Sequence, residues 1–225
     1  MKRSSPQPLK KLLCIGLLLL AAGPLWAHTV NYVLEKAPVT EVASFYLKLG
    51  FEHIIPEGLD HILFVVALCL LGRNLKTILW QATAFTVAHS ITLALSLQNI
   101  ITLPGNLVEP IIALSIVFVA VENLLLTELK PWRLGIVFLF GLIHGLGFAS
   151  ALNETGLPRN AFFTSLLSFN VGVELGQAAV IAVVYGLLVY PFRNQVRYRK
   201  ALVYPLSGLI ALVAMYWAVE RMVQV

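Results

Sequence analysis

The chain has 225 residues, a formal net charge of +5, 59% hydrophobic residues and only 12% charged residues. This composition, with a mean hydropathy of +0.84, is typical of repeated membrane spans and excludes an ordinary water-soluble globular domain. The basic residues stand in short clusters between apolar runs, where such residues set membrane topology, so we exclude nucleic acid as a partner.

The first 27 residues have the three parts of a secretory signal peptide. A basic start over residues 2–11 precedes an apolar core over 12–22, and the small residue Ala27 follows a helix-breaking Gly-Pro pair. We expect cleavage after Ala27, which leaves His28 at the mature amino terminus. The alternative is an uncleaved first span, but a core of about 11 residues is short for a ~30 Å bilayer.

The mature chain, 28–225, is predicted to be a single all-α integral membrane domain, a six-span up-and-down helical bundle. Val39, Val42, Tyr46 and Leu49 recur at helical spacing, so a short amphipathic helix on the membrane surface is expected first. Six apolar runs with short connections follow, near 55–72, 76–98, 107–127, 132–151, 160–190 and 201–222.

Basic residues alternate between the loops and so predict the orientation. The loops after the first, third and fifth runs are basic, and the others carry almost no Lys or Arg. The basic residues in these loops are Arg73, Lys76, Lys130, Arg133, Arg193, Arg197, Arg199 and Lys200. These loops are therefore expected in the cytoplasm, with both mature termini on the periplasmic side of a bacterial-type inner membrane.

Ionisable residues gather in the stretch from 50 to 71, where a charge inside an apolar run is costly and usually functional. Those immediately before or inside the apolar run are His53, Glu57, Asp60 and His61. At ~1.5 Å rise per residue, His61, His89 and His144 each lie roughly 16 to 20 Å from the basic end of their own run. Three histidines from three helices are thus predicted to share one layer near the bilayer midplane.

Imidazole and carboxylate are common ligands of divalent transition metals. The predicted metal ligands are His61, His89, His144, Asp60 and His53, and residues that support the site or the path to it are Glu57, Ser90, Asn170, Glu174 and Gln177. A polar relay or plain helix packing remains open for the histidine layer. Glu122 and Asn123, near the basic end of the third run, are read as interfacial.

Four segments of the chain resemble the HupE/UreJ family of membrane proteins, associated with hydrogenase and urease accessory functions. They read HIIPEGLDHILF at 53–64, FTVAHSITL at 85–93, HGLGFA at 144–149 and FNVGVELGQ at 169–177. The resemblance implies a six-span protein with a signal peptide, and some members are described as nickel permeases with histidine ligands. Residue by residue it points to His53, Asp60, His61, His89 and His144.

Three functions remain open from the sequence. The first is transport or handling of a divalent transition metal, nickel or cobalt. The second is an intramembrane zinc hydrolase that acts on a lipid or amide, with Asp60 or Glu174 as general base. The third is a metal-binding accessory scaffold. Membrane lipid and the metal ion are the expected partners, with a homo-oligomer or an accessory membrane protein as open alternatives.

Overall fold

Long apolar runs joined by short turns produce a fold that is helical throughout the described part of the chain. The structure is a computed structural model that describes residues 34–155, 157–195 and 197–223; the predicted signal peptide lies outside these residues. The elements are α2 (Val39–Ile54), α3 (Leu59–Leu71), α4 (Leu75–Leu97), α5 (Gly105–Leu125), α6 (Arg133–Thr155), η1 (Arg159–Ala161), α7 (Phe162–Val184), η2 (Tyr185–Val189), α8 (Tyr190–Phe192), η3 (Arg199–Val203) and α9 (Tyr204–Val223).

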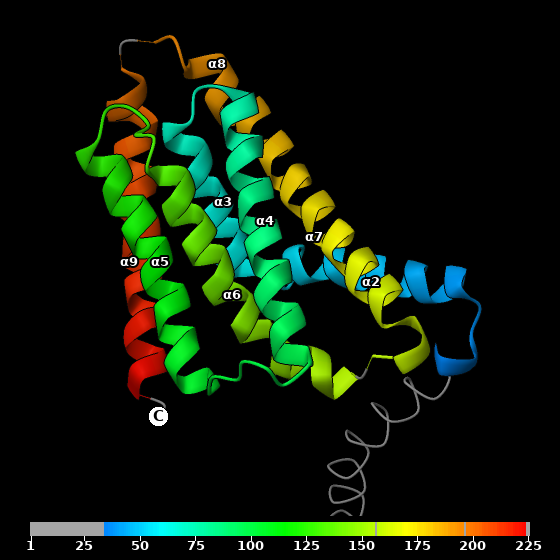
Figure 1. The fold of residues 1–225 in the computed structure, drawn as a ribbon. Helices are drawn as coiled ribbons and strands as arrows, with labels where there is room; N and C mark the ends of the chain where they lie inside the picture. The colour runs from blue at the N-terminus through cyan, green and yellow to red at the C-terminus, as the bar shows by residue number, and fades with distance from the viewer. Residues whose placement is uncertain (1–33, 156, 196, 224–225) are drawn as a thin grey trace, which may run out of the picture.

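Three pairs of closely packed helices, α4 with α6, α2 with α7 and α5 with α9, are arranged about α3 (Figure 1). Helix α3 packs against α2, α4, α5, α7 and α9, and its His61 and Phe64 rings lie beside the His144 and Phe140 rings of α6. It is apolar on nearly all sides, and 8 of its 13 residues are buried. A helix that is apolar all round is stable only when other helices cover it, which explains the central place of α3.

The six-span prediction is confirmed only as an all-helical bundle with four or five candidate spans. Length and composition qualify α4, α5, the segment 162–192 and the segment 199–223. A fifth span exists if α2 and α3, bent by 67° at a short break, form one broken span. The apolar part of α6, Arg133–Ala149, falls in the class of shorter helices. The predicted run 55–72 begins too early, because residues 55–58 form the break and α3 starts at Leu59.

Helix α2 contains the amphipathic segment that was expected near the start of the mature chain, and it continues beyond that segment to Ile54. Its buried residues, which recur every three or four positions, are Val42, Tyr46, Gly50, His53 and Ile54. This face packs on α7, where a Cβ at Gly50 would overlap the carbonyl oxygen of Phe169 and a Cβ at Gly172 would overlap that of Leu47. The two backbones therefore touch, and His53 is carried into the bundle.

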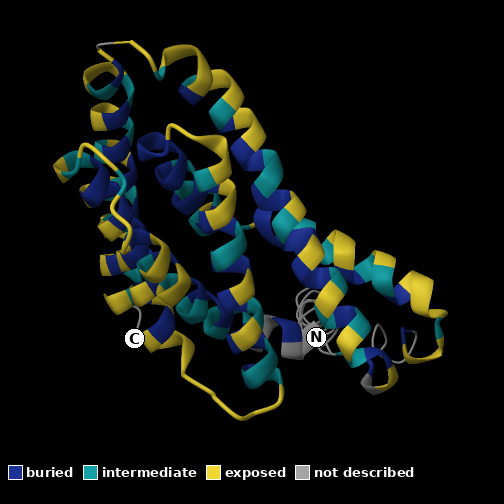
Figure 2. Ribbon diagram, turned by 45° about the horizontal axis from the view of Figure 1, so that its top comes forward, coloured by how far each residue is buried: buried dark blue, intermediate teal, exposed yellow. Residues whose placement is uncertain are grey.

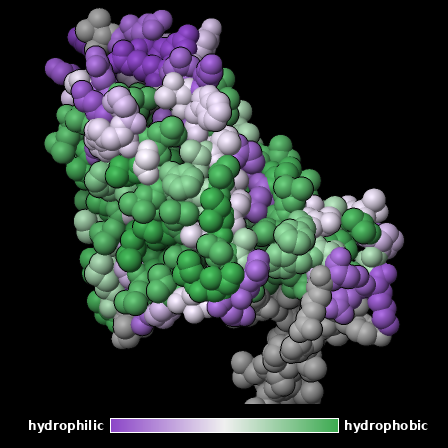
Figure 3. Space-filling view, in the orientation of Figure 1, coloured by the Kyte–Doolittle hydropathy of each residue, from purple (hydrophilic) through white to green (hydrophobic). Residues whose placement is uncertain are grey.

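The surface of the bundle is apolar around its middle and polar at one end. Each long helix has one buried and one exposed face (Figure 2), and many large apolar side chains, such as Val87, Phe163 and Leu212, are exposed. Figure 3 shows a hydrophobic band below a hydrophilic end. We call this the basic end, since it carries Arg73, Lys76 and Lys130; the other, where α9 terminates, is the opposite end. Such a band is typical of a multi-pass membrane protein.

Candidate metal centre

Four histidines from four helices meet inside the bundle. His53 lies in the last turn of α2, His61 in the first turn of α3, His89 within α4 and His144 within α6. In a straight helix, residues eight apart would be separated by about 12 Å along the axis. The break at 55–58 instead folds α3 back, so that the ring centroids of His53 and His61 are 4.7 Å apart.

Three of these imidazoles are close enough to share an ion. One ring nitrogen from each of His53, His61 and His89 lies within 4.8 Å of the others, and all three residues are buried. Nitrogens bound to one tetrahedral ion at ~2.1 Å would be roughly 3.4 Å apart. An ion would thus require these rings to move together by about 1 Å or a little more, a distance within the reach of side-chain rotation.

His144 stands next to this group and is already oriented. Its ring centroid is 5.2 Å from that of His61, and its Nδ1 lies 2.8 Å from the carbonyl oxygen of Phe140. A carbonyl can only accept, so Nδ1 carries the proton and the lone pair of His144 is on Nε2. This is the arrangement by which backbone carbonyls orient metal-binding imidazoles.

Five of the ring nitrogens of these histidines are buried without a hydrogen-bond partner among the described residues. These buried atoms are Nε2 of His53, His61 and His144 and both ring nitrogens of His89. A buried polar atom left unpaired costs about 1–3 kcal/mol, and five such atoms in one place form an unusually unsatisfied interior. A bound cation would accept one lone pair from each imidazole that it reaches, which pairs most of these atoms; the second nitrogen of a neutral His89 carries a proton. The donor set fits a divalent transition metal such as nickel, cobalt or zinc.

A cleft connects this centre to the opposite end of the bundle. It has a volume of about 320 Å³ and is lined by His53, Asp60, His61, Glu109, Ile112, His144, Gly147, Phe148 and Arg221. Glu109 is exposed near the start of α5, which places the mouth at that end. His89, with no exposed surface, lies deeper.

Asp60, predicted as a ligand, lies at the cleft and is engaged elsewhere. Its two carboxylate oxygens accept hydrogen bonds of 3.2 and 2.9 Å from Nη2 of Arg221 on α9, and the same guanidinium donates to the carbonyl oxygen of Glu109. Asp60 is not among the three residues whose ligand atoms converge. Arg221 was missed by the sequence analysis, although a basic residue at the end of the last apolar run was the available signal.

The predicted supporting residues on α7 face α4. Asn170 lies beside the His89 ring, Gln177 accepts a hydrogen bond of 3.1 Å from Thr86, and Glu174 accepts one of 2.6 Å from Thr83. Figure 3 shows hydrophilic side chains interrupting the hydrophobic band along the line between these two helices. Polar groups thus continue from His89 toward the basic end.

The other two supporting residues lie apart from the histidines' nitrogens. Ser90 donates to the carbonyl oxygen of Thr86, one turn earlier in its own helix, which is a helix-packing role. Glu57 is exposed in the break between α2 and α3.

Glycines of α6 hold His89 and His144 at the same level. A Cβ at Gly145 would overlap the carbonyl oxygen of His89, and a Cβ at Gly141 would overlap that of Phe85. Thr92 adds a hydrogen bond of 2.7 Å to the carbonyl oxygen of Leu142 across the same contact. Small residues allow helix backbones in a membrane to approach closely, and here the approach sets the separation of two histidine-bearing helices.

Comparison with known proteins identifies the family of this chain. The model of the HupE / UreJ proteins matches residues 29–221. The chain belongs to the HupE/UreJ family. This confirms the resemblance stated above, and the family is linked to the handling of nickel and cobalt. No curated protein and no solved structure matches the chain.

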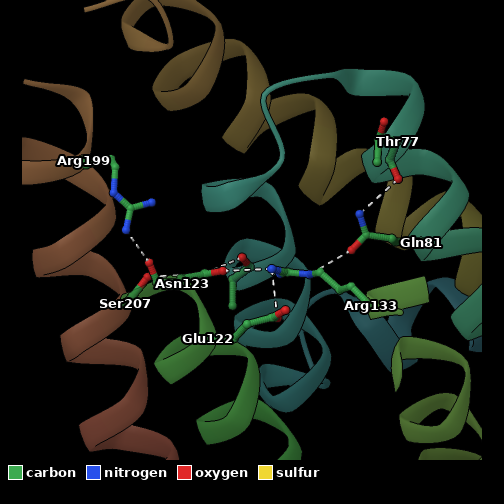
Figure 4. Close-up of polar contacts among 8 residues, drawn as sticks. Thr77, Gln81, Glu122, Asn123, Arg133, Arg199 and Ser207 are labelled. Carbon is green, nitrogen blue, oxygen red and sulfur yellow. Dashed lines mark hydrogen bonds and ion pairs between the residues drawn. The ribbon is translucent and has the colours of Figure 1, made fainter. Parts of the chain in front are cut away.

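This HupE/UreJ protein has a second buried polar cluster, which the sequence did not predict (Figure 4). Arg133, expected in a cytoplasmic loop, is only 2% exposed and forms an ion pair of 3.0 Å with Glu122, which is also buried. Asn123 accepts a hydrogen bond from the same guanidinium. Glu122 and Asn123 were expected to be interfacial, but α3, α6 and α9 cover them. Their position near a helix end gave no indication of this burial.

Proposed function

We propose that this HupE/UreJ protein transports a divalent transition metal ion, nickel or cobalt, through the four-histidine centre. The observation that carries the proposal is the cleft from the opposite end. It reaches three histidines whose Nε2 atoms are buried and have no hydrogen-bond partner in the described part of the chain. A cleft lets an ion arrive from water, and the imidazoles replace part of its hydration shell. The metal is the cargo of the protein.

The proposed placement in the membrane follows the distribution of charge. The basic end faces the cytoplasm, and the cleft opens to the periplasm of a bacterial-type inner membrane. The chain crosses six times, in α3, α4, α5, α6, the 162–192 segment and the 199–223 segment, after a cleaved signal peptide. Helix α3 is only 13 residues long, which is tolerated because other helices, rather than lipid, surround it.

The proposed path has an entrance and a continuation. Asp60, Glu109 and the exposed Glu57 supply carboxylates on the periplasmic side, which attract a cation. Beyond the histidines, the ion is proposed to continue toward the basic end, where Arg133 lies buried between α4 and α5. Transport requires ligands that release the ion again, and a few neutral imidazoles bind less tightly than a closed set of thiolates.

The zinc hydrolase hypothesis is weaker because both of its candidate general bases are engaged. Asp60 is ion-paired with Arg221, and Glu174 accepts a hydrogen bond from Thr83 on the α4–α7 side. A general base must reach the water that it activates. An accessory scaffold would bind metal without moving it, and the same experiment distinguishes it.

The test is metal uptake by the purified protein in liposomes that contain a metal-sensitive dye. We expect uptake of nickel or cobalt by the wild type and at least a tenfold loss in His61→Gln and His89→Gln. His28→Gln is the matched control, since it removes a histidine outside the described residues and should leave uptake unchanged. Stoichiometric metal binding without uptake would support the scaffold, and bound zinc with turnover of a lipid or amide would support the hydrolase.

A further inference from the structure

The helix pairs α4/α6 and α5/α9 meet along one seam, and its two ends differ. At the opposite end, the histidine cleft lies in this seam: Glu109 and Ile112 of α5 face His144 and Gly147 of α6 across it. At the basic end the seam is closed, because Arg133 of α6 reaches Glu122 and Asn123 of α5 (Figure 4). The seam is therefore open at one end and held shut at the other.

The closure is made by a single guanidinium. Arg133 donates through Nε to Gln81 Oε1 of α4 at 3.1 Å and through Nη1 to Asn123 Oδ1 at 3.2 Å, and Nη1 also forms an ion pair of 3.0 Å with Glu122 Oε2. Asn123 in turn donates to the carbonyl oxygen of Ala67 in α3 and to the Ser207 hydroxyl of α9. One side chain of α6 thus links the α4/α6 pair to α3, α5 and α9.

An apolar layer separates this closure from the histidines. The Phe64 and Phe85 rings are tilted against each other with centroids 5.0 Å apart, and the Phe85 centroid lies 4.8 Å from that of His144. Both phenylalanines belong to a buried cluster that includes Val119 of α5 and Val137 of α6. An ion that leaves the histidines along the seam must pass this layer and then Arg133.

The buried Arg133–Glu122 pair lacks some of the hydrogen bonds that a permanent structural ion pair would have. The Nη2 of Arg133 and both carboxylate oxygens of Glu122 are buried without hydrogen-bond partners among the described residues. A buried ion pair gains stability only with good geometry and full hydrogen bonding, so a partly satisfied pair is weak evidence for a stabilising role. A second cleft, of about 370 Å³, also reaches Gln81 and Arg133 from the basic end. The guanidinium therefore separates this cleft from the protein interior.

We propose that the Arg133–Glu122 pair is the inner gate of the protein. In the conformation described, the gate is shut and the histidine cleft is open at the other end of the same seam. Release of the guanidinium from Glu122 and Asn123 lets α4/α6 rock against α5/α9, which opens the inner end and narrows the outer cleft. The inference rests on the proposed transport, and two discrete arrangements of one seam are what alternating access requires.

The gate is tested by the reactivity of buried thiols toward a maleimide, which does not depend on transport. Val137→Cys, in a background with Cys14→Ser and Cys69→Ala, places a reporter one turn from Arg133 in the seam. The native Cys69, in a Cys14→Ser background, is the second reporter, since it is fully buried in a different cluster that contains residues of α7. Opening of the seam exposes the first reporter, whereas general loosening exposes both.

We expect Arg133→Gln and Glu122→Gln each to accelerate labelling at position 137 about tenfold or more, with Cys69 unchanged. Arg199→Gln is the matched control, because Arg199 donates to the carbonyl oxygen of the same Asn123 but contacts no residue across the seam in the described bonds. It should leave both reporters unchanged. Equal labelling of position 137 in the wild type and both gate variants would overturn the proposal, as would equal acceleration in Arg199→Gln.

If the gate variants do not fold, both reporter thiols react and the comparison between variants is lost. A second measurement then uses the protein with Arg133 and Glu122 unchanged. Nickel added to the Val137→Cys reporter should change its labelling rate at least threefold, since an ion that moves through the seam must alter the balance of its two states. No change in a reporter protein that binds nickel would overturn the gate. If the gate variants open the seam but the liposomes take up no metal, the proposed transport fails and the conformational device stands.

Discussion

The Arg221 guanidinium lies 2.9 Å from the Asp60 carboxylate, and Asp60 immediately precedes the buried His61 in α3. The contact ties the end of the last helix to the start of the central one, at the mouth of the histidine cleft. It also keeps a positive charge beside a site proposed for cations and keeps the nearest carboxylate away from the imidazoles.

Replacement of Arg221 by Gln should therefore tighten metal binding. The change removes a repulsive charge and frees Asp60 to turn toward the ion, so we expect a three- to tenfold lower dissociation constant, or about 0.7–1.4 kcal/mol. Arg221→Gln should lower the free energy of unfolding by at most about 1 kcal/mol, since the Arg221–Asp60 ion pair is partly exposed. Isothermal titration with nickel measures the dissociation constant, and thermal unfolding measures the loss of stability. Arg221→Lys, which keeps the charge, should bind like the wild type; weaker binding in Arg221→Gln would mean that Arg221 holds Asp60 in its working position.

The four histidines should not contribute equally. His53, His61 and His89 offer ring nitrogens that converge, whereas His144 is outside that group. We expect Ala at any of the first three positions to abolish stoichiometric binding, and His144→Ala to weaken it by 10- to 100-fold, the usual cost of losing a residue that supports the ligands. Elemental analysis after dialysis measures the stoichiometry. The opposite order, with His144 essential and His53 dispensable, would show that the ion binds nearer α6.

Gly145→Ala should weaken both the fold and the metal site. The new methyl group would overlap the carbonyl oxygen of His89, so α4 and α6 must separate, at a cost of about 1–3 kcal/mol for overpacking. Gly135→Ala is the matched control in the same helix, since nothing lies within 4 Å of its Cβ position. It should be neutral or stabilise slightly, as Ala favours a helix over Gly. Thermal unfolding and nickel titration of both variants check this; equal behaviour would contradict the close crossing.

Gly50→Ala should affect the site through His53 alone. Its methyl group would overlap the Phe169 carbonyl and push α2 off α7, which withdraws one imidazole while His61 and His89 stay in place. We expect weaker metal binding, with an unfolding temperature lowered less than in Gly145→Ala because α2 lies at the edge of the bundle. Gly186→Ala, a glycine near the end of the α7 segment with nothing within 4 Å of its Cβ position, should bind as the wild type does. Unchanged binding in Gly50→Ala would remove His53 from the ligand set.

The predicted helices were correct where the sequence pattern is long and continuous. The runs near 76–98 and 107–127 correspond closely to α4 and α5, because apolar stretches of about 20 residues satisfy their own backbone hydrogen bonds and have few alternatives. The run near 55–72 was misjudged, since its composition does not reveal that residues 55–58 break the helix. For the same reason, the structure supports four or five candidate spans where the sequence predicted six.

Some of the candidate site was also accessible from the sequence. Rare ionisable residues in apolar runs, counted along the helix axis, selected His61, His89 and His144, and all three lie in one buried cluster with His53. The same reasoning assigned Asp60 to the ion. Counting residues along a helix gives the position of a side chain along the axis but not the direction in which it points. Arg221, 161 positions away in the chain, takes that carboxylate instead.

Composition and periodicity by themselves determined that this chain forms apolar helices, that its basic residues gather between them, and that histidines occur at a similar depth in three of them. These are properties of single segments, and local physics decides them. The tertiary structure decided which residues meet: His53 with His61 through a broken helix, Asp60 with Arg221, and Arg133 with Glu122 inside the bundle. Such contacts depend on how helices cross and rotate against one another, which close packing of distant glycines and side chains sets and no single segment encodes.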